Sequence, residues 1–305
     1  MSKTTKTYRL AGILSFFIVL FLMPLGHLLM ILTETIFKDS KFISAIIIGL
    51  IGFGFLLFGV VKNSKAILSS LLGLLAGVLI WTGWVEFSFV WIAEKLQVAP
   101  LIENGEVTTK PEYLVMLSSI GLLFTILLYF LFTPTGCQFF NWFQKHLRLS
   151  KHIKVKHIST KPVALTTFIE TIVILWTFYI VLLLVYDKDI AGDQHPITYI
   201  VAFGSLFWSM FLIQKLVQIK NFDYAIRYAI PTVIIFWNFI EIIGRWNLLK
   251  EIWVHPTEHV FENSLIAILL IVFIVYYYYK NAQINKKKQI KYKTKKHKKK
   301  QQLFK

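Results

Sequence analysis

Long apolar runs alternate with short polar stretches along the whole chain. In a helix, a run of about 20 apolar residues crosses roughly 30 Å of hydrocarbon. Eight segments have about that length, and they lie at 10–32, 42–61, 67–92, 113–132, 163–186, 197–217, 225–243 and 264–279. The pattern therefore predicts an all-α integral membrane protein with eight transmembrane helices.

Composition agrees with this prediction and excludes an ordinary soluble domain. Hydrophobic residues make up 56% of the 305-residue chain, and the mean hydropathy is +0.62. The first apolar segment follows a short basic stretch but has no small-residue cleavage site after it, so we expect it to remain as a helix. The single cysteine, Cys137, excludes an intramolecular disulfide and any metal or redox motif built from several cysteines.

The basic residues predict the orientation of the chain. Of the 33 Lys and Arg residues, 26 fall in the N-terminus, alternate connections and the tail, and 7 fall in the other connections. By the positive-inside rule the richer set is cytoplasmic, which places both termini in the cytoplasm and favours a bacterial inner membrane. Topology thus explains most of the net charge of +17, and we do not expect a nucleic-acid partner.

The chain also shows signs of an internal duplication. A shift of 155 residues aligns the second and third segments with the sixth and seventh, and Glu86 then meets Glu241 and Trp91 meets Trp246. Two tandem four-helix units in parallel orientation would produce this match. The expected divisions are a first four-helix unit at 1–133, an amphipathic helix and basic linker at 134–162, a second four-helix unit at 163–282, and a basic tail at 283–305.

Three polar residues within the apolar segments and one just beyond the seventh segment form the candidate functional cluster, at the depth of the outer leaflet. They are His27, Glu86, Glu241 and Arg245. In one interpretation the two acids reach interfacial water or a neighbouring cation, and Glu241 pairs with Arg245 one helical turn later. In the other, the acids converge across the pseudo-axis of the repeat and create a proton or cation site.

Aromatic residues mark the expected membrane interfaces. Trp91 and Trp246 are placed at the outer boundary, where amphipathic rings gather. On the cytoplasmic side, "CQFFNWFQKHLRL" puts Phe139, Trp142 and Phe143 on one helical face and polar side chains, Gln144 among them, on the other, as in a helix lying in the interface. We expect the basic tail to be disordered alone and to attract anionic lipids.

Two outer loops carry local signals. An Asn-Gly pair at 104–105 lies between short apolar runs and predicts a hairpin. In "HPTEH", His255 and His259 have a spacing that can share a metal, but Pro256 stands where a zinc protease has its glutamate. We expect no metal and no cofactor, and we interpret Pro256 as the first turn of a short surface helix.

Three classes of function remain open from the sequence. Few intramembrane charges and heavily aromatic helices favour a non-catalytic subunit or anchor of a larger membrane assembly, with the lipid bilayer and other membrane subunits as partners. The paired glutamates and the duplication favour a small-molecule or ion transporter. A lipid enzyme ranks last because the sequence has no His-box, nucleophile elbow, paired-Asp or Cys motif.

Overall fold

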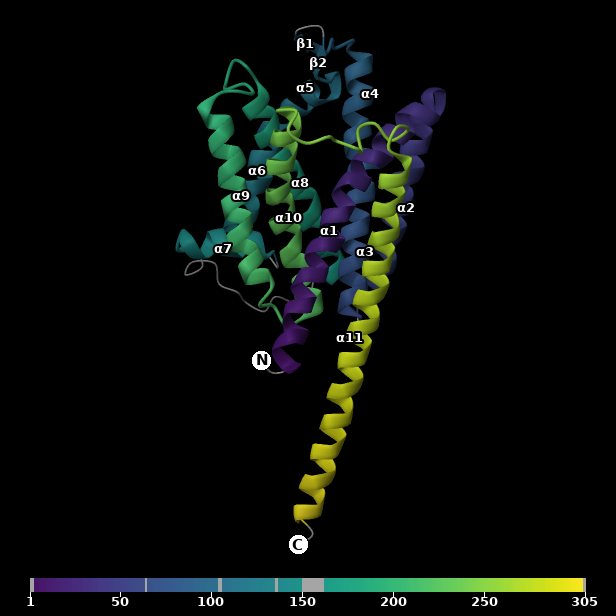
Figure 1. Ribbon diagram of the computed structural model, residues 1–305, viewed down its shortest axis with the longest axis vertical. Helices are drawn as coiled ribbons and strands as arrows, with labels where there is room; N and C mark the ends of the chain where they lie inside the picture. The colour runs from purple at the N-terminus through teal and green to yellow at the C-terminus, as the bar shows by residue number, and fades with distance from the viewer. Residues whose placement is uncertain (1–2, 64, 104–105, 135–136, 150–161, 304–305) are drawn as a thin grey trace.

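The computed structural model describes residues 3–63, 65–103, 106–134, 137–149 and 162–303 of the chain as a bundle of long helices with one small hairpin (Figure 1). Within these ranges seven helices are long and apolar enough to cross a membrane, and a bent pair makes an eighth span if it is counted as one. The prediction of a multi-pass α-helical membrane protein is therefore confirmed at this level.

The elements follow the predicted spans closely, with added short pieces at the ends. They are α1 (Lys3–Ile36), η1 (Lys38–Ser40), α2 (Lys41–Val61), α3 (Ala66–Ile80), η2 (Trp81–Glu86), α4 (Phe87–Lys95), β1 (Leu101–Glu103), β2 (Glu106–Thr109), α5 (Pro111–Leu117), α6 (Ile120–Phe132), α7 (Gln138–His146), α8 (Val163–Tyr186), α9 (Pro196–Leu216), α10 (Phe222–Arg245) and α11 (Val260–Leu303).

Helices α1, α3, α8 and α10 form the core, and α2, α9 and α11 lie further out. Most of α10 is buried, and its apolar residues pack with those of α1 and α8 in one large cluster. The outer helices instead expose large apolar side chains, such as Ile46 on α2, Phe207 on α9 and Val272 on α11. Exposed apolar faces of this extent suit contact with lipid rather than water.

Small residues let the core helices approach closely, as the Gly73-x-x-x-Gly77 spacing indicates. A Cβ atom on Gly73 would lie 2.3 Å from the carbonyl oxygen of Ala164, and one on Gly77 would lie 2.7 Å from the Thr171 Cβ. Both contacts join α3 to α8. Close packing at small residues thus occurs between the two predicted four-helix units as well as within the first.

The fourth predicted span is broken. Helices α5 and α6 meet at a 50° bend after Leu117, and Ser118 and Ser119 lie at the bend. Their hydroxyls donate to the carbonyls of Val115 and Met116, which belong to the last turn of α5. Serine side chains that bond back to the helix in this way commonly accompany bends.

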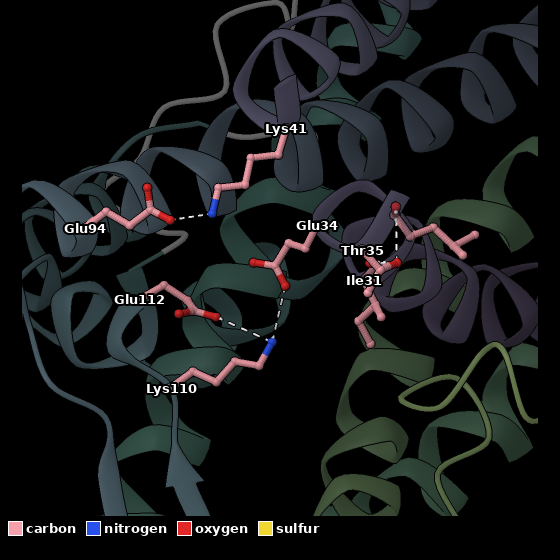
Figure 2. A network of polar contacts seen from close by, with 8 residues as sticks. Ile31, Glu34, Thr35, Lys41, Glu94, Lys110 and Glu112 are labelled. Atoms are coloured by element: carbon pink, nitrogen blue, oxygen red, sulfur yellow. Dashed lines mark hydrogen bonds and ion pairs between the residues drawn. The ribbon is translucent and has the colours of Figure 1, made fainter. Parts of the chain in front are cut away.

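The end of the bundle opposite the chain termini carries the hairpin, α5 and the connection from α10 to α11 (Figure 1). Strands β1 and β2 pair antiparallel, as the Asn-Gly signal predicts, although residues 104–105 themselves are outside the described ranges. Lys110 forms ion pairs with Glu34 of α1 and Glu112 of α5, and Lys41 pairs with Glu94 (Figure 2). These contacts hold α5 and α4 over the ends of α1 and α2.

Two expectations for the other end need correction. Gln144 is not on a solvated face of α7: it is buried, and its Nε2 donates to the carbonyls of Phe130 and Thr133 at 2.9 and 2.8 Å. The carbonyls at the end of a helix such as α6 have no partner within the helix, and Gln144 donates to two of them.

The tail, expected to be disordered, continues α11 as helix to Leu303, because a helix that is already nucleated extends readily through Lys and Gln. The predicted basic linker at 150–161 falls outside the described residues.

Candidate functional site

A cavity of about 300 Å³ lies inside the bundle near the hairpin end. Residues of α1, α3, η2, α8 and α10 form its walls. Above it lie β2, the first turn of α5, and the connection between α10 and α11, which contributes Glu251, Trp253 and Val254. All four members of the candidate cluster, namely His27, Glu86, Glu241 and Arg245, line this cavity.

A π-helical turn positions one wall. The six residues of η2 interrupt the long helix that runs from α3 to α4, and Trp81, Thr82 and Glu86 of this turn face the cavity. On the other side Gly83 packs so tightly on α2 that a Cβ would lie 2.6 Å from the Ala45 carbonyl oxygen. The wider turn therefore permits close packing on one side while it turns polar groups inward, and such π turns occur often at functional sites.

Glu86 is buried deeper than the sequence suggests. Its exposed fraction is 3%, and it precedes α4, whose nine residues place it about 13 Å inside the end of the continuous helix. Glu86 thus lies among packed side chains rather than at the exposed end of the helix. Glu241, four residues before the end of α10, faces the same cavity from the opposite wall.

A chain of hydrogen bonds and one His–Glu pair connects the two acids across the bundle. The Tyr179 hydroxyl donates to Glu86 Oε1 at 3.0 Å and lies 3.3 Å from the Nε2 of His27. The same Nε2 is 3.4 Å from Glu241 Oε1, which also accepts a hydrogen bond from Trp237 Nε1 at 2.6 Å. The chain thus joins η2, α8, α1 and α10 through side chains alone.

The direction of these bonds assigns a proton to His27. Because the Tyr179 hydroxyl hydrogen points to Glu86, its oxygen can only accept from His27. Glu241 in its ionised form also only accepts. With Glu241 ionised, the hydrogen-bond network therefore places a hydrogen on His27 Nε2, between Tyr179 and Glu241.

Arg245 forms contacts at the outer rim of the cavity. Its Nε donates to Asp193 Oδ1 at 2.5 Å, and its guanidinium lies 4.2 Å from the centre of the Tyr186 ring. Glu251 approaches from the connection above, over Gly244, where a Cβ would lie 2.3 Å from its Oε1. Burial and the nearby Glu241 carboxylate raise the pKa of Glu251 to about 7, against the opposing charges of Arg245 and His255.

Two residues that line the cavity each have a buried polar atom without a hydrogen-bond partner among the described residues. The atoms are Asn238 Nδ2 and the Tyr186 hydroxyl. Trp81, which also lines the cavity, forms a hydrogen bond with Glu86. A buried donor without a partner costs about 1–3 kcal/mol, so these groups make the cavity suited to a ligand with acceptor oxygens.

The other candidate residues lie away from the cavity. Trp91 is half exposed on α4, and Trp246 stacks on Tyr199 and donates to the Asp193 carbonyl. The aromatic residues of α7 pack inward: Phe139 and Trp142 both contact Trp208 of α9, and Phe143 packs against both of them.

His255 and His259 lie in the connection between α10 and α11. His259 Nδ1 lies 3.6 Å from Glu262 Oε1. Across the described ranges no group of three or more His, Cys, Asp or Glu side chains is arranged to hold a metal ion.

Sequence reasoning missed several residues that line the cavity. Asn238 lies one helical turn before Glu241, and this i, i+3 spacing on a helix was a usable signal. Tyr179 and Tyr186 lie in an apolar, aromatic segment where nothing distinguishes them from lipid-facing residues. Asp193 and Glu251 belong to connections, and only the folded structure brings them to the helix ends.

Comparison with protein-family models, with curated proteins and with solved structures gives no match to this chain.

Proposed function

We propose that the protein is a transporter that binds a small polar solute in the outer cavity and carries it across the membrane. The observation that carries this proposal is the chain of polar contacts from Glu86 to Glu241 across the bundle, together with the buried Asn238 Nδ2, which lacks a partner among the described residues. A bundle that served only as an anchor would be more stable with apolar groups at these positions.

The size and lining of the cavity support the same proposal. Its volume of about 300 Å³ lies at the lower end of the range for small-molecule sites. The lining is mostly aromatic and aliphatic, with a few polar groups that converge from different helices, as is typical of such sites. Two halves of one bundle that contribute one acid each would also suit a mechanism in which the halves move against each other.

The orientation proposed for this function has both termini in the cytoplasm, in a bacterial inner membrane. In its support, the described ends of α1 and α11 lie at the same end of the bundle (Figure 1). Single cysteines can test it in a Cys137→Ser background. Glu258→Cys should react with a membrane-impermeant maleimide on intact cells, whereas Gln283→Cys should react only after lysis. The reverse labelling pattern would place the cavity on the cytoplasmic side of the membrane and would contradict uptake from outside.

We also propose the tandem four-helix arrangement. Its support is that Glu86 and Glu241, aligned by the sequence shift, both face the cavity. Their local backbones differ, since Glu86 ends a π turn and Glu241 lies within an α-helix. Changes in helix packing after the duplication would account for the π turn in one copy and the regular α-helix in the other.

Transport is tested in liposomes that contain the purified protein. Uptake of radiolabelled ethanolamine, succinate, glucose and rubidium is measured for the wild type, for Glu241→Gln and for Glu258→Gln. Glu258 is an exposed acid of the outer connection and serves as the matched control. We expect at least one solute to enter faster than in protein-free liposomes, and we expect Glu241→Gln, but not Glu258→Gln, to abolish that uptake.

Two results would reject the proposal: no solute enters above the background, or Glu241→Gln transports as well as the wild type. The hypothesis of an assembly subunit makes a different prediction, namely that purification in mild detergent yields stoichiometric partner proteins. That outcome, combined with absent uptake, would favour the subunit over the transporter.

A further inference from the structure

We infer that the solute is a small organic cation that also carries an acceptor oxygen, such as an ammonium group with a hydroxyl. This inference rests on the proposed function, because it names the class of solute that the cavity would take. Three features of the cavity lead to it: the excess of carboxylates, the aromatic rings beside them, and the unpartnered amide nitrogen of Asn238.

Carboxylates outnumber cations around the cavity. Lys110 and Arg245 are the permanent cations of the lining, and each is already paired, Lys110 with Glu34 and Glu112 and Arg245 with Asp193.

Apart from these two paired cations, the titratable groups of the lining include three acids, Glu86, Glu241 and Glu251, and one histidine, His27. A solute that brings positive charge lowers the repulsion among these acids, whereas an anion would have to lie next to them in a site of low polarity.

Aromatic rings flank both intramembrane acids. Near Glu86, the ring of Tyr179 lies 5.4 Å from that of Trp81 and 6.2 Å from that of Tyr113. Near Glu241, the rings of Trp237 and Trp253 are 4.9 Å apart. Each acid therefore has its own group of rings.

Rings that surround a carboxylate bind ammonium groups well, because the faces of the rings attract the cation and the acid balances its charge. The cavity rim already contains one contact of this kind, between the Arg245 guanidinium and the Tyr186 ring.

The amide of Asn238 indicates the second chemical group of the solute. Its Nδ2 can only donate a hydrogen bond. A cation without oxygen would leave this donor without a partner, so the solute should bring an acceptor oxygen to it. A hydroxyl or carboxyl oxygen on the same molecule as the ammonium group satisfies this requirement.

The test compares three probes of similar shape by the fluorescence of the purified protein, since Trp81, Trp237 and Trp253 line the cavity. Choline has both an ammonium group and a hydroxyl, tetramethylammonium lacks the oxygen, and 3,3-dimethyl-1-butanol is the uncharged counterpart of choline. Ethanolamine is a fourth probe with a smaller ammonium group. We expect choline or ethanolamine to bind about tenfold more tightly than the uncharged alcohol.

Variants separate the contribution of the acid Glu241, which should attract the ammonium group, from that of Asn238, which should bind the oxygen. Glu241→Gln should weaken choline binding about tenfold and leave the binding of the alcohol nearly unchanged, whereas Glu258→Gln should alter neither. Asn238→Leu should remove the preference for choline over tetramethylammonium. A melting curve for each variant shows whether it is folded, so that a loss of binding is interpreted only for folded protein.

The inference is overturned if neither choline nor ethanolamine binds, or if the uncharged alcohol binds as tightly as choline. This failure differs from failure of the proposed function. If succinate or glucose enters liposomes in a Glu241-dependent manner while the cations do not bind, the proposal of transport stands and the inference of a cationic solute is wrong. If the cations bind but no solute is transported, the inference of a cation-binding cavity stands and the proposal of transport is wrong.

Discussion

Replacing Gly73 by alanine tests the contact that brings α3 against α8. The added Cβ would lie 2.3 Å from the Ala164 carbonyl oxygen, whereas ordinary contacts of this kind begin at 3.4 Å. The two helices would have to separate by about 1 Å, because the obstructing atom belongs to a backbone and cannot rotate away. Overpacking of this extent costs about 1–3 kcal/mol.

A matched variant isolates that cost. Gly204 of α9 is also a helical glycine, but a Cβ there meets no atom within 4 Å. Alanine favours a helix over glycine by about 1 kcal/mol, and both variants receive this gain equally. The difference between Gly73→Ala and Gly204→Ala therefore reports the α3–α8 contact alone.

The assay uses the only cysteine of the chain. Cys137 is buried, so a maleimide dye that fluoresces on reaction with thiols reports unfolding as the detergent solution is heated. We expect Gly204→Ala to melt at or above the wild-type temperature and Gly73→Ala to melt roughly 2–10 °C below Gly204→Ala. Equal melting temperatures for the two variants would refute the close approach of α3 and α8.

Three further predictions concern single polar groups. Tyr277→Phe should lower the free energy of unfolding by about 1–2 kcal/mol, because the buried hydroxyl bonds to Ser15 and the Phe222 carbonyl, and the exposed Tyr279→Phe should change the melting temperature little. Gln144→Leu should cost about 1–3 kcal/mol by leaving two α6 carbonyls without a donor, which the same dye assay measures against Asn141→Leu of the same helix. Glu251 has a pKa of about 7, raised from 4.5, so ionisation weakens the folded state as the pH rises through this interval. Glu251→Gln should therefore melt like the wild type at pH 4.5 and gain about 1 kcal/mol over it at pH 8, a gain reduced because the group is partly exposed; an equal difference at both pH values would contradict this reasoning.

The spans could be predicted because hydrocarbon imposes a length and a composition on anything that crosses it. The same argument failed at the fourth span, where Ser118 and Ser119 are too small and too mildly polar to alter the hydropathy of a long window. It also could not reveal the π turn at Trp81–Glu86, which depends on how Gly83 packs against α2.

The candidate cluster was found because charge is rare inside a membrane segment, so Glu86, Glu241 and His27 are conspicuous in the sequence. Their surroundings were not predictable. Tyr179 links Glu86 to His27, yet it is one tyrosine among many in aromatic helices. Whether a buried acid meets water, a cation or a tyrosine depends on contacts between distant segments, and those contacts leave no periodic signal in one sequence.

The continuous α11 changes what the basic tail can reach. A helix of 44 residues is about 66 Å long, roughly twice the hydrocarbon thickness, so its last third projects far beyond the headgroups if the helix keeps its direction. Electrostatic attraction to anionic lipid fades within about 8 Å at physiological ionic strength. Only the first turns of the tail, near Lys280 and Lys286, would then interact with the bilayer. The rest of the helix would extend away from the membrane as a rod with a lysine-rich sequence, which acidic macromolecules can approach from every side.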